Sequence, residues 1–143
     1  MGVITFNADS TSLILNGFGL VDFIEGDYLE LAPVNPLTSH TNGANGAVNI
    51  SKRVDAGVHD LTVRVIKASA SDVYLNSARN QGAPTVFTGS IKEDFTRDGS
   101  AGVESWLLEN GSITDQPGST KNNQDGNSTV EYKIRFRNCT RQV

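Results

Sequence analysis

Residue types that could carry out chemistry are few in this sequence, and their spacing does not assemble a catalytic set. His59 directly precedes Asp60, a pair that could serve acid–base catalysis only if both side chains met. Adjacent residues of a strand point to opposite faces, so we expect both to have structural roles. Cys139 follows the last expected strand with no basic residue placed to activate it, which predicts an inert thiol.

Acidic residues gather between positions 22 and 30, and carboxylates are the ligands that calcium prefers. Their spacing is not that of an EF-hand, and the two histidines and one cysteine lack the spacing of a zinc site. Asn16–Gly19 contains two glycines, but no helix is expected after it, so it does not match a phosphate-binding loop. We therefore predict that the protein is not an enzyme and has no metal site or cofactor.

Length and composition favour one domain rich in turns. The chain has 143 residues, of which 37% are hydrophobic, 14 are Gly and one is Cys. This is a common single-domain size, and one cysteine excludes an intrachain disulfide. The sequence has no apolar run of about 18 residues, and residues 1–10 lack the basic and apolar pattern of a signal peptide. We expect no membrane anchor.

Charge is distributed unevenly along the chain. Five acidic residues precede the first basic residue, Lys52, whereas residues 130–143 carry four basic residues and only Glu131 as an acid. The acidic start and the basic end could meet within one molecule or between neighbours, or both could simply be solvated. With a net charge of −4, the chain lacks the basic surface that gripping a nucleic acid requires.

Short segments of alternating polarity predict an antiparallel β-sandwich or barrel of about seven or eight strands. In the last strand, Val130, Tyr132, Ile134 and Phe136 point to one face and four charged residues to the other. Asn-Gly and Asp-Gly steps predict tight turns, including one at Asn110-Gly111 that would end a strand. The expected strands cover residues 12–15, 19–24, 28–32, 47–52, 60–67, 86–94, 102–109 and 130–138.

One segment changes to the helical period and predicts a helix over 69–81. Ser69 and Asp72 fit a capping box, and Gly82 fits the stop. We expect Val73, Tyr74 and Ala78 to pack on the sandwich.

Two segments are too polar for core strands. The extended loop at 37–58 is long for a loop that has no partner, so we expect it to be a stacking arm that orders against a neighbouring subunit. A second polar loop is expected at 115–129. The expected contact residues of the arm are His40, Asn42, Asn45, Lys52, Arg53 and Asp55.

A family resemblance adds to this interpretation. Residues 16–30 (NGFGLVDFIEGDYLE) resemble the opening hairpins of the tail tube proteins of contractile-tailed bacteriophages. The similarity continues through 43–46, through 56–76 (AGVHDLTVRVIKASASDVYLN) and in the closing strand at 131–139. It covers about two thirds of the chain and implies a relation to the tube proteins of type VI secretion systems and pyocins.

The resemblance implies a single tail tube domain over 1–143 and homohexameric rings that stack into a hollow tube inside a contractile sheath. The implied partners are further copies of the chain, the sheath protein, the tape-measure protein, the tail terminator and the baseplate hub. DNA would pass through without specific binding, and the location would be the virion, after assembly in the host cytoplasm.

A conduit for DNA should avoid a basic lumen, because each contact that neutralises a phosphate would slow passage. Lumen candidates are therefore Asn49, Ser51, Asp22, Glu25 and Asp27. Arg135 and Arg137 are expected at a subunit interface, with the early acids as partners. Two alternatives stay open: another ring-forming phage tail protein, such as a terminator or connector, and a monomeric β-barrel that binds a small ligand.

Overall fold

The computed structural model describes residues 2–121, 123 and 128–143, and within them the chain is mainly antiparallel β-structure with one α-helix, α1 (Ala70–Arg79). A 3-10 turn covers Ala8–Ser10. The strands of the described residues are β1 (Ile4–Phe6), β2 (Ser12–Leu15), β3 (Phe18–Gly19), β4 (Leu29–Pro33), β5 (Thr38–Asn42), β6 (Val48–Lys52), β7 (His59–Ile66), β8 (Phe87–Arg97), β9 (Ser100–Asp115) and β10 (Thr129–Gln142).

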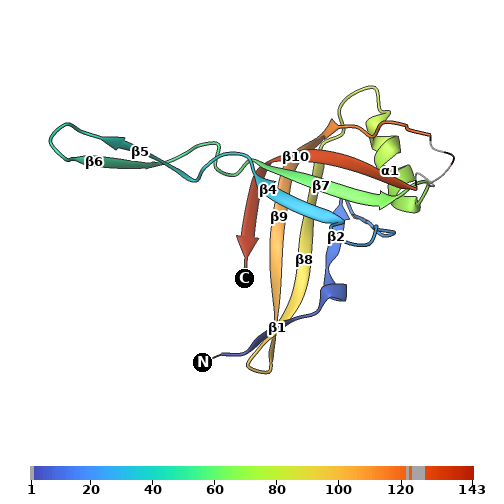
Figure 1. Ribbon diagram of the computed structural model, residues 1–143, viewed down its shortest axis with the longest axis horizontal. Coiled ribbons are helices and arrows are strands. Elements are labelled where there is room, and N and C mark those ends of the chain that lie inside the picture. The colour runs from blue at the N-terminus through green and yellow to red at the C-terminus, as the bar shows by residue number, and fades with distance from the viewer. Residues whose placement is uncertain (1, 122, 124–127) are drawn as a thin grey trace.

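Eight of these strands form one sheet in the order β3-β2-β8-β9-β10-β7-β4, with β1 added beside β8. The sheet bends, so that β4, β7 and β10 lie across β2, β8 and β9 (Figure 1). The predicted fold class, mainly β with one helix, is confirmed. β5 and β6 form a separate two-stranded sheet.

The core lies between the two halves of the bent sheet, and α1 covers one end of it (Figure 1). The alternation predicted for β7 and β10 is confirmed: Leu61, Val63, Val65, Ile134 and Phe136 are fully buried. Burial of such side chains contributes about 1.5–3 kcal/mol each. This shared core fixes which face of every strand is outside.

The helix begins as predicted, and Tyr74 and Ala78 pack against the core as expected, but the third expected residue does not. The Ser69 hydroxyl accepts a hydrogen bond from the Asp72 amide at 3.3 Å, so the expected cap is confirmed. The expectation for Val73 is wrong, because its side chain is 63% exposed, while Leu75 is fully buried. The reason is Ser71, whose hydroxyl accepts from the Val21 amide at 2.8 Å and donates to the Val21 carbonyl at 2.6 Å. This docking turns the helix so that Val73 faces outward.

The strand expected over 19–24 is wrong for most of its length. Only Phe18–Gly19 forms a strand, and Phe23 makes a single bridge to Val65. Asp22 has a φ of 60°, which interrupts an extended strand. The segment is held instead by the two hydrogen bonds between Val21 and the Ser71 hydroxyl.

The turn expected at Asn110-Gly111 is also wrong. β9 continues through these residues to Asp115, and its register against β8 shifts between the pairs Phe87–Gly111 and Gly89–Leu108. Asn110 has a φ of 56°, so the left-handed residue makes a bulge inside a strand rather than a hairpin. Gly111 leaves room for the Phe136 ring, since a Cβ on Gly111 would lie 2.4 Å from a ring carbon.

The last strand is longer than its apolar alternation suggested. β10 runs to Gln142, so Cys139 lies within the strand rather than after it, opposite Leu108 of β9. Burial raises the pKa of the Cys139 thiol to about 11, which suits the expected inert role. The polar loop expected at 115–129 lies between β9 and β10 and falls partly outside the described residues.

Candidate functional site

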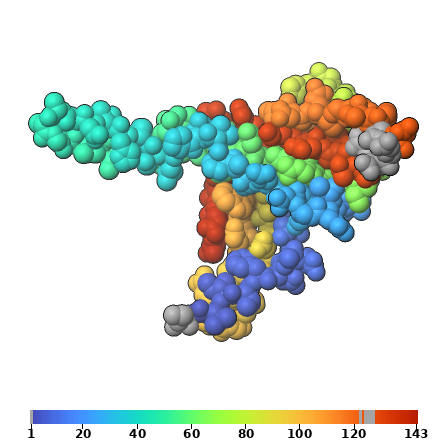
Figure 2. Space-filling view, viewed as in Figure 1, coloured from blue at the N-terminus to red at the C-terminus, as the bar shows by residue number. Residues whose placement is uncertain are grey.

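The β5–β6 hairpin projects from the body and occupies one end of the longest axis, while α1 lies at the other end (Figures 1 and 2). Its strands pair with each other and with no other strand of the described chain. Two backbone hydrogen bonds fix its base. The Val34 amide donates to the Val58 carbonyl and the Arg53 amide donates to the Leu37 carbonyl, each at 3.0 Å. The segment expected to be an extended loop is therefore a hairpin with a fixed base, which we call the arm (residues 37–53).

The arm carries four of the predicted contact residues on its surface. His40 and Asn42 lie on β5, Lys52 ends β6, and the Asn45 side chain accepts from the Ala47 amide at 3.3 Å at the tip. In the register of the hairpin, His40 lies opposite Ile50 and Asn42 lies opposite Val48. The side chains of both pairs therefore share one face of the arm. The lumen candidates Asn49 and Ser51 share the other face with Thr41 and Ser39.

Besides Leu37 at its base, the arm exposes two apolar side chains on β6 that were missed as contact residues. Val48 is 59% exposed and Ile50 is 62% exposed. Their alternation resembles that of a half-buried strand, but the arm has no partner in the described chain to cover them. The signal was present in the sequence, as two branched residues at period two within a polar stretch. An isolated two-stranded hairpin is at best marginally stable, so this face is suited to contact with another surface.

The structure brings Arg53, Asp55 and Arg137 together at the base of the arm. Two guanidinium nitrogens of Arg53 donate to the two carboxylate oxygens of Asp55, each at 2.9 Å. This hydrogen bonding holds the pKa of Asp55 below its usual value, and the nearby charge of Arg137 lowers that pKa further. Three of the predicted interface residues therefore form one cluster.

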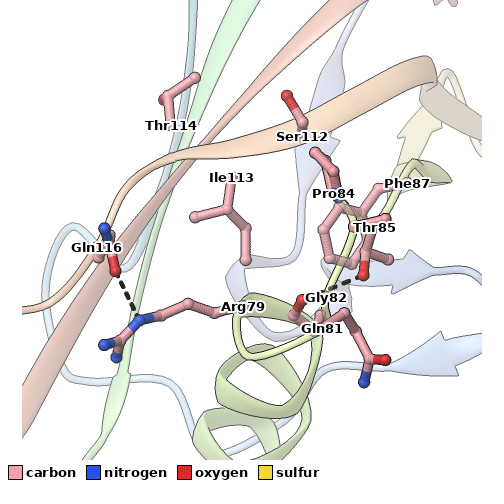
Figure 3. Close-up of a pocket in the computed structure, with 12 residues that line it drawn as sticks. Arg79, Gln81, Gly82, Pro84, Thr85, Phe87, Ser112, Ile113, Thr114 and Gln116 are labelled. Atoms are coloured by element: carbon pink, nitrogen blue, oxygen red, sulfur yellow. Dashed lines mark hydrogen bonds between the residues drawn. The ribbon is translucent and has the colours of Figure 1, made fainter.

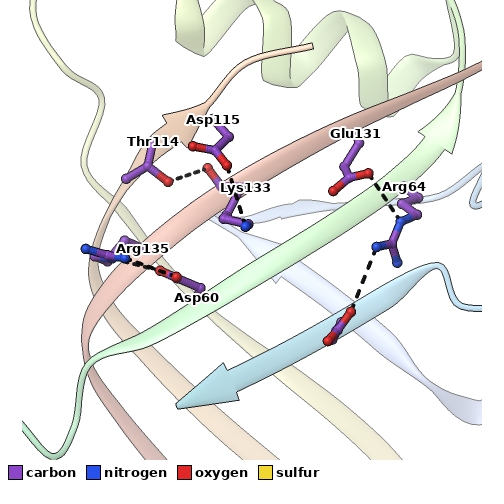
Figure 4. A network of polar contacts seen from close by, with 8 residues as sticks. Asp60, Arg64, Thr114, Asp115, Glu131, Lys133 and Arg135 are labelled. Atoms are coloured by element: carbon purple, nitrogen blue, oxygen red, sulfur yellow. Dashed lines mark hydrogen bonds and ion pairs between the residues drawn. The ribbon is translucent and has the colours of Figure 1, made fainter. Parts of the chain in front are cut away.

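Arg135 finds its partner within the chain. Its guanidinium donates to both carboxylate oxygens of Asp60, at 2.8 and 3.1 Å, across the β7–β10 register (Figure 4). Hydrogen bonding from Arg135 holds the pKa of Asp60 below its usual value. Asp60 therefore takes the place that the sequence analysis assigned to Asp22, Glu25 or Asp27.

The same outer face of β4, β7, β9 and β10 carries further ion pairs (Figure 4). Arg64 lies 3.8 Å from the Glu30 carboxylate and 3.4 Å from that of Glu131, and the Lys133 ammonium lies 3.5 Å from the Asp115 carboxylate. Exposed pairs of this kind contribute only about 0–1 kcal/mol each. Their main effect is that the basic face expected on β10 is neutralised by acids of its own chain.

The acidic lumen candidates do not join the arm. Asp22, Glu25 and Asp27 are exposed in the segment between β3 and β4. Val21 of this segment is hydrogen-bonded to Ser71 of α1, at the end of the molecule opposite the arm (Figure 1). The two groups of lumen candidates are therefore separated by the length of the body.

His59 and Asp60 are separated as expected for neighbours in a strand. His59 is buried against Trp106, with 5.5 Å between ring centroids, and its Nδ1 lies 3.0 Å from the Gly57 carbonyl oxygen. Asp60 points outward to Arg135. Among the described residues, no group of three or more His, Cys, Asp or Glu side chains is placed to hold a metal ion.

A hollow of about 280 Å³ lies between the end of α1 and β9 (Figure 3). Phe87, Ile113 and Pro84 line it, and two of its polar side chains have partners: Arg79 donates to Gln116 at 2.7 Å and the Thr85 hydroxyl donates to the Ala78 carbonyl at 3.1 Å. The described residues that line the hollow do not form a set of reactive groups. In the described part of the chain, no helix is long and apolar enough to span a membrane.

The fold of the chain is similar to that of solved components of contractile injection particles. No protein-family model matches it, and no curated protein matches it in sequence. Solved structures do match, and a tail-tube-like fold is what they share with this chain.

One such structure is a chain of the sheath–tube complex of an extracellular contractile injection system, PVC, in the extended state. The TM-score is 0.65 at 9% identity, over 97% of this chain and 92% of that one. A chain of the PVC sheath/tube terminator gives 0.63 at 11% identity, over 97% of each chain. A chain of the anti-feeding prophage cap, the tube terminating cap, gives 0.64 at 12% identity, over 97% of this chain and 91% of that one.

Proposed function

We propose that this chain is a structural subunit of a phage tail tube, in which hexameric rings stack into a hollow conduit inside a contractile sheath. The observation that carries the proposal is a fold match extending over 97% of the chain to a sheath–tube complex. The unmatched remainder is too short to contain the arm, so the match includes an element that pairs with no other strand of the described residues. The role is structural and not enzymatic.

The arm supports an assembly role on physical grounds. It exposes Val48 and Ile50 on one face, and its base is fixed so that it points away from the body (Figure 2). A contact made by a projecting element to a different surface of the next copy is heterologous, and such contacts generate rings or helical stacks. The proposed contact residues are His40, Asn42, Asn45, Lys52, Arg53 and Asp55 of the arm and its base, with Arg135 and Arg137 on the neighbouring sheet face.

The proposed partners follow from the proposed place in the particle. The chain contacts further copies of itself, the sheath protein outside, and the tape-measure protein inside during assembly. The terminator and the baseplate hub close the two ends. The particle forms in the host cytoplasm, and the mature location is the virion.

The proposed lumen is polar and not basic, so that DNA passes without being held. Asn49 and Ser51 of the arm and Asp22, Glu25 and Asp27 remain its candidates. The self-neutralised ion pairs of the outer sheet face fit the same requirement, because paired charges give a weak net field.

A second candidate is a ring that terminates a tube. The match to the terminator covers 97% of that chain, and the match to the cap gives nearly the same TM-score as the sheath–tube complex. A terminator would form one ring and would not polymerise.

Negative-stain electron microscopy of the concentrated protein tests the proposal. Stacked rings that lengthen into tubes are the expected result, and single rings that never stack would favour the terminator. A chain that stays monomeric at all concentrations would contradict both and would favour a monomeric ligand-binding domain.

A further inference from the structure

A groove beside the edge strand β4 has the composition of a docking surface. It has a volume of about 370 Å³, and its apolar floor is formed by Leu29, Leu31, Ile91 and Trp106. Leu29, Leu31 and Trp106 belong to the partly buried residues around the core, so part of each side chain is still in contact with solvent. The groove therefore leaves apolar surface uncovered next to the core.

The rim of this groove is acidic. Asp27, Glu93 and Glu104 line it, and none of the described residues that line it is basic. Glu93 accepts a hydrogen bond from the Thr11 hydroxyl at 3.2 Å, and Glu104 pairs with Arg141 at 3.2 Å. The Asp27 carboxylate is exposed at the rim and forms no ion pair with another described residue, while the backbone carbonyl of Asp27 accepts from Arg64 at 2.7 Å. The groove is thus suited to a partner that is apolar at its centre and cationic at one end.

One wall of the groove is an open sheet edge. Among the described residues, β4 pairs with β7 only. The Tyr28 carbonyl accepts from the Arg64 amide, and the Val34 amide donates to the Val58 carbonyl. In an antiparallel pair, every second residue directs its backbone N–H and C=O toward the partner strand. Tyr28 and Val34 direct theirs toward β7, so the backbone groups of Leu29 and Leu31 point away from β7. A free edge of this kind can accept another extended strand.

The arm has the complementary composition. Residues 31–54 contain no acidic residue, and they include Lys52 and Arg53. Val48, Ile50 and Lys52 alternate along β6, so two apolar side chains and one cation share a face. The two apolar side chains are suited to the apolar floor of the groove, and the cation is suited to the carboxylates at its rim.

A chain cannot fill its own groove in this conformation. The arm is fixed at its base by the contacts of Val34 with Val58 and of Arg53 with Leu37, and it points away from the body (Figure 1). The occupant that the observations favour is therefore the arm of another copy.

We infer that the arm of one copy docks in the groove beside β4 of a second copy, with Val48 and Ile50 on the apolar floor and Lys52 at the acidic rim. This inference rests on the proposed function, because it names the surface that receives the arm. The contact joins two different surfaces, so it propagates from copy to copy.

Sedimentation velocity of the full chain over a concentration series tests the inference from the side of the arm. Ile50→Asp places a charge on the apolar floor and is expected to weaken association about tenfold or more. Asn49→Asp introduces the same carboxylate on the opposite face of the same strand and is the matched control. It should associate like the wild type.

The groove is tested by Asp27→Lys combined with Glu93→Lys, which is expected to weaken association to a similar extent. Glu25→Lys is the matched control, because Glu25 lies near Asp27 but does not line the groove. Adding Lys52→Glu to the groove variant should restore part of the association, since the charges are then exchanged across the contact. Circular dichroism of each variant checks that the fold is kept.

The outcomes separate this inference from the proposed function. If the wild type associates and Ile50→Asp or the groove variant associates equally well, the inference is overturned while the assembly role stands. If Ile50→Asp fails to associate but the groove variant is normal, the arm docks elsewhere and the assignment of the groove is wrong. A wild type that never associates overturns both.

Discussion

Gly111 offers a sharp test of the packing between β9 and β10. A Cβ at this position would lie 2.4, 2.5 and 2.9 Å from three carbons of the Phe136 ring, whereas ordinary contacts begin near 3.4 Å. Phe136 is fully buried, so its ring can move aside only by displacing other core side chains. Overpacking of a core costs about 1–3 kcal/mol. We expect Gly111→Ala to lower the free energy of unfolding by that amount.

The assay is thermal unfolding followed by circular dichroism, with urea unfolding as a second measure. For a domain of this size, the expected loss lowers the melting temperature by about 3–10 °C. Gly82→Ala is the matched control, because a Cβ at Gly82 would meet no atom of the described residues within 4 Å. Phe136→Leu should cost less in the Gly111→Ala background than alone, because the two sites share one space. A Gly111→Ala protein as stable as the wild type would refute the reasoning.

Four further predictions concern the surface and the thiol. Limited proteolysis should cut the arm near 43–47 in free subunits and spare it in assembled particles, and equal cutting in both states would contradict docking of the arm. Arg135→Glu places a second carboxylate against Asp60, so we expect a lower unfolding midpoint and, if this face is an interface, weaker and more salt-sensitive assembly measured by sedimentation. The pKa of Asp60 is lower in the folded than in the unfolded protein, so its ionised form stabilises the fold above about pH 4, the pKa of an unfolded Asp. This contribution is lost as the pH falls through the pKa of the folded state. The decrease of the urea midpoint in acid should therefore be smaller in Asp60→Asn. The raised pKa of Cys139, about 11, predicts slow reaction with a thiol reagent at pH 8 in the native protein and fast reaction in denaturant, and an equally fast native reaction would contradict this.

Local rules placed much of the scaffold correctly. The period-two pattern of residues 60–67 and 130–138 identified the buried faces of β7 and β10, because side chains alternate strictly along a strand. Asn16-Gly17 and Asp98-Gly99 are tight turns with positive φ at both residues, as their residue types indicate. The N-cap at Ser69 likewise depends on neighbours within one turn.

Other features depended on partners distant in the sequence. The burial of Ser71 instead of Val73 follows from hydrogen bonds to Val21, fifty positions away. Asn110-Gly111 has the residues of a turn, but it became a bulge because β8 and β10 pair on both sides of it.

The sequence by itself determined the buried faces of β7 and β10, where the helix begins, and that the segment around 37–58 cannot belong to the core. Only the tertiary structure decided that this segment is an arm with a fixed base, and that Arg135 is paired with Asp60. The groove beside β4 also appeared only in three dimensions, since its floor joins Leu29 to Ile91 and Trp106. The physical reason is that periodicity specifies the face of a residue, whereas strand order and register specify its neighbours.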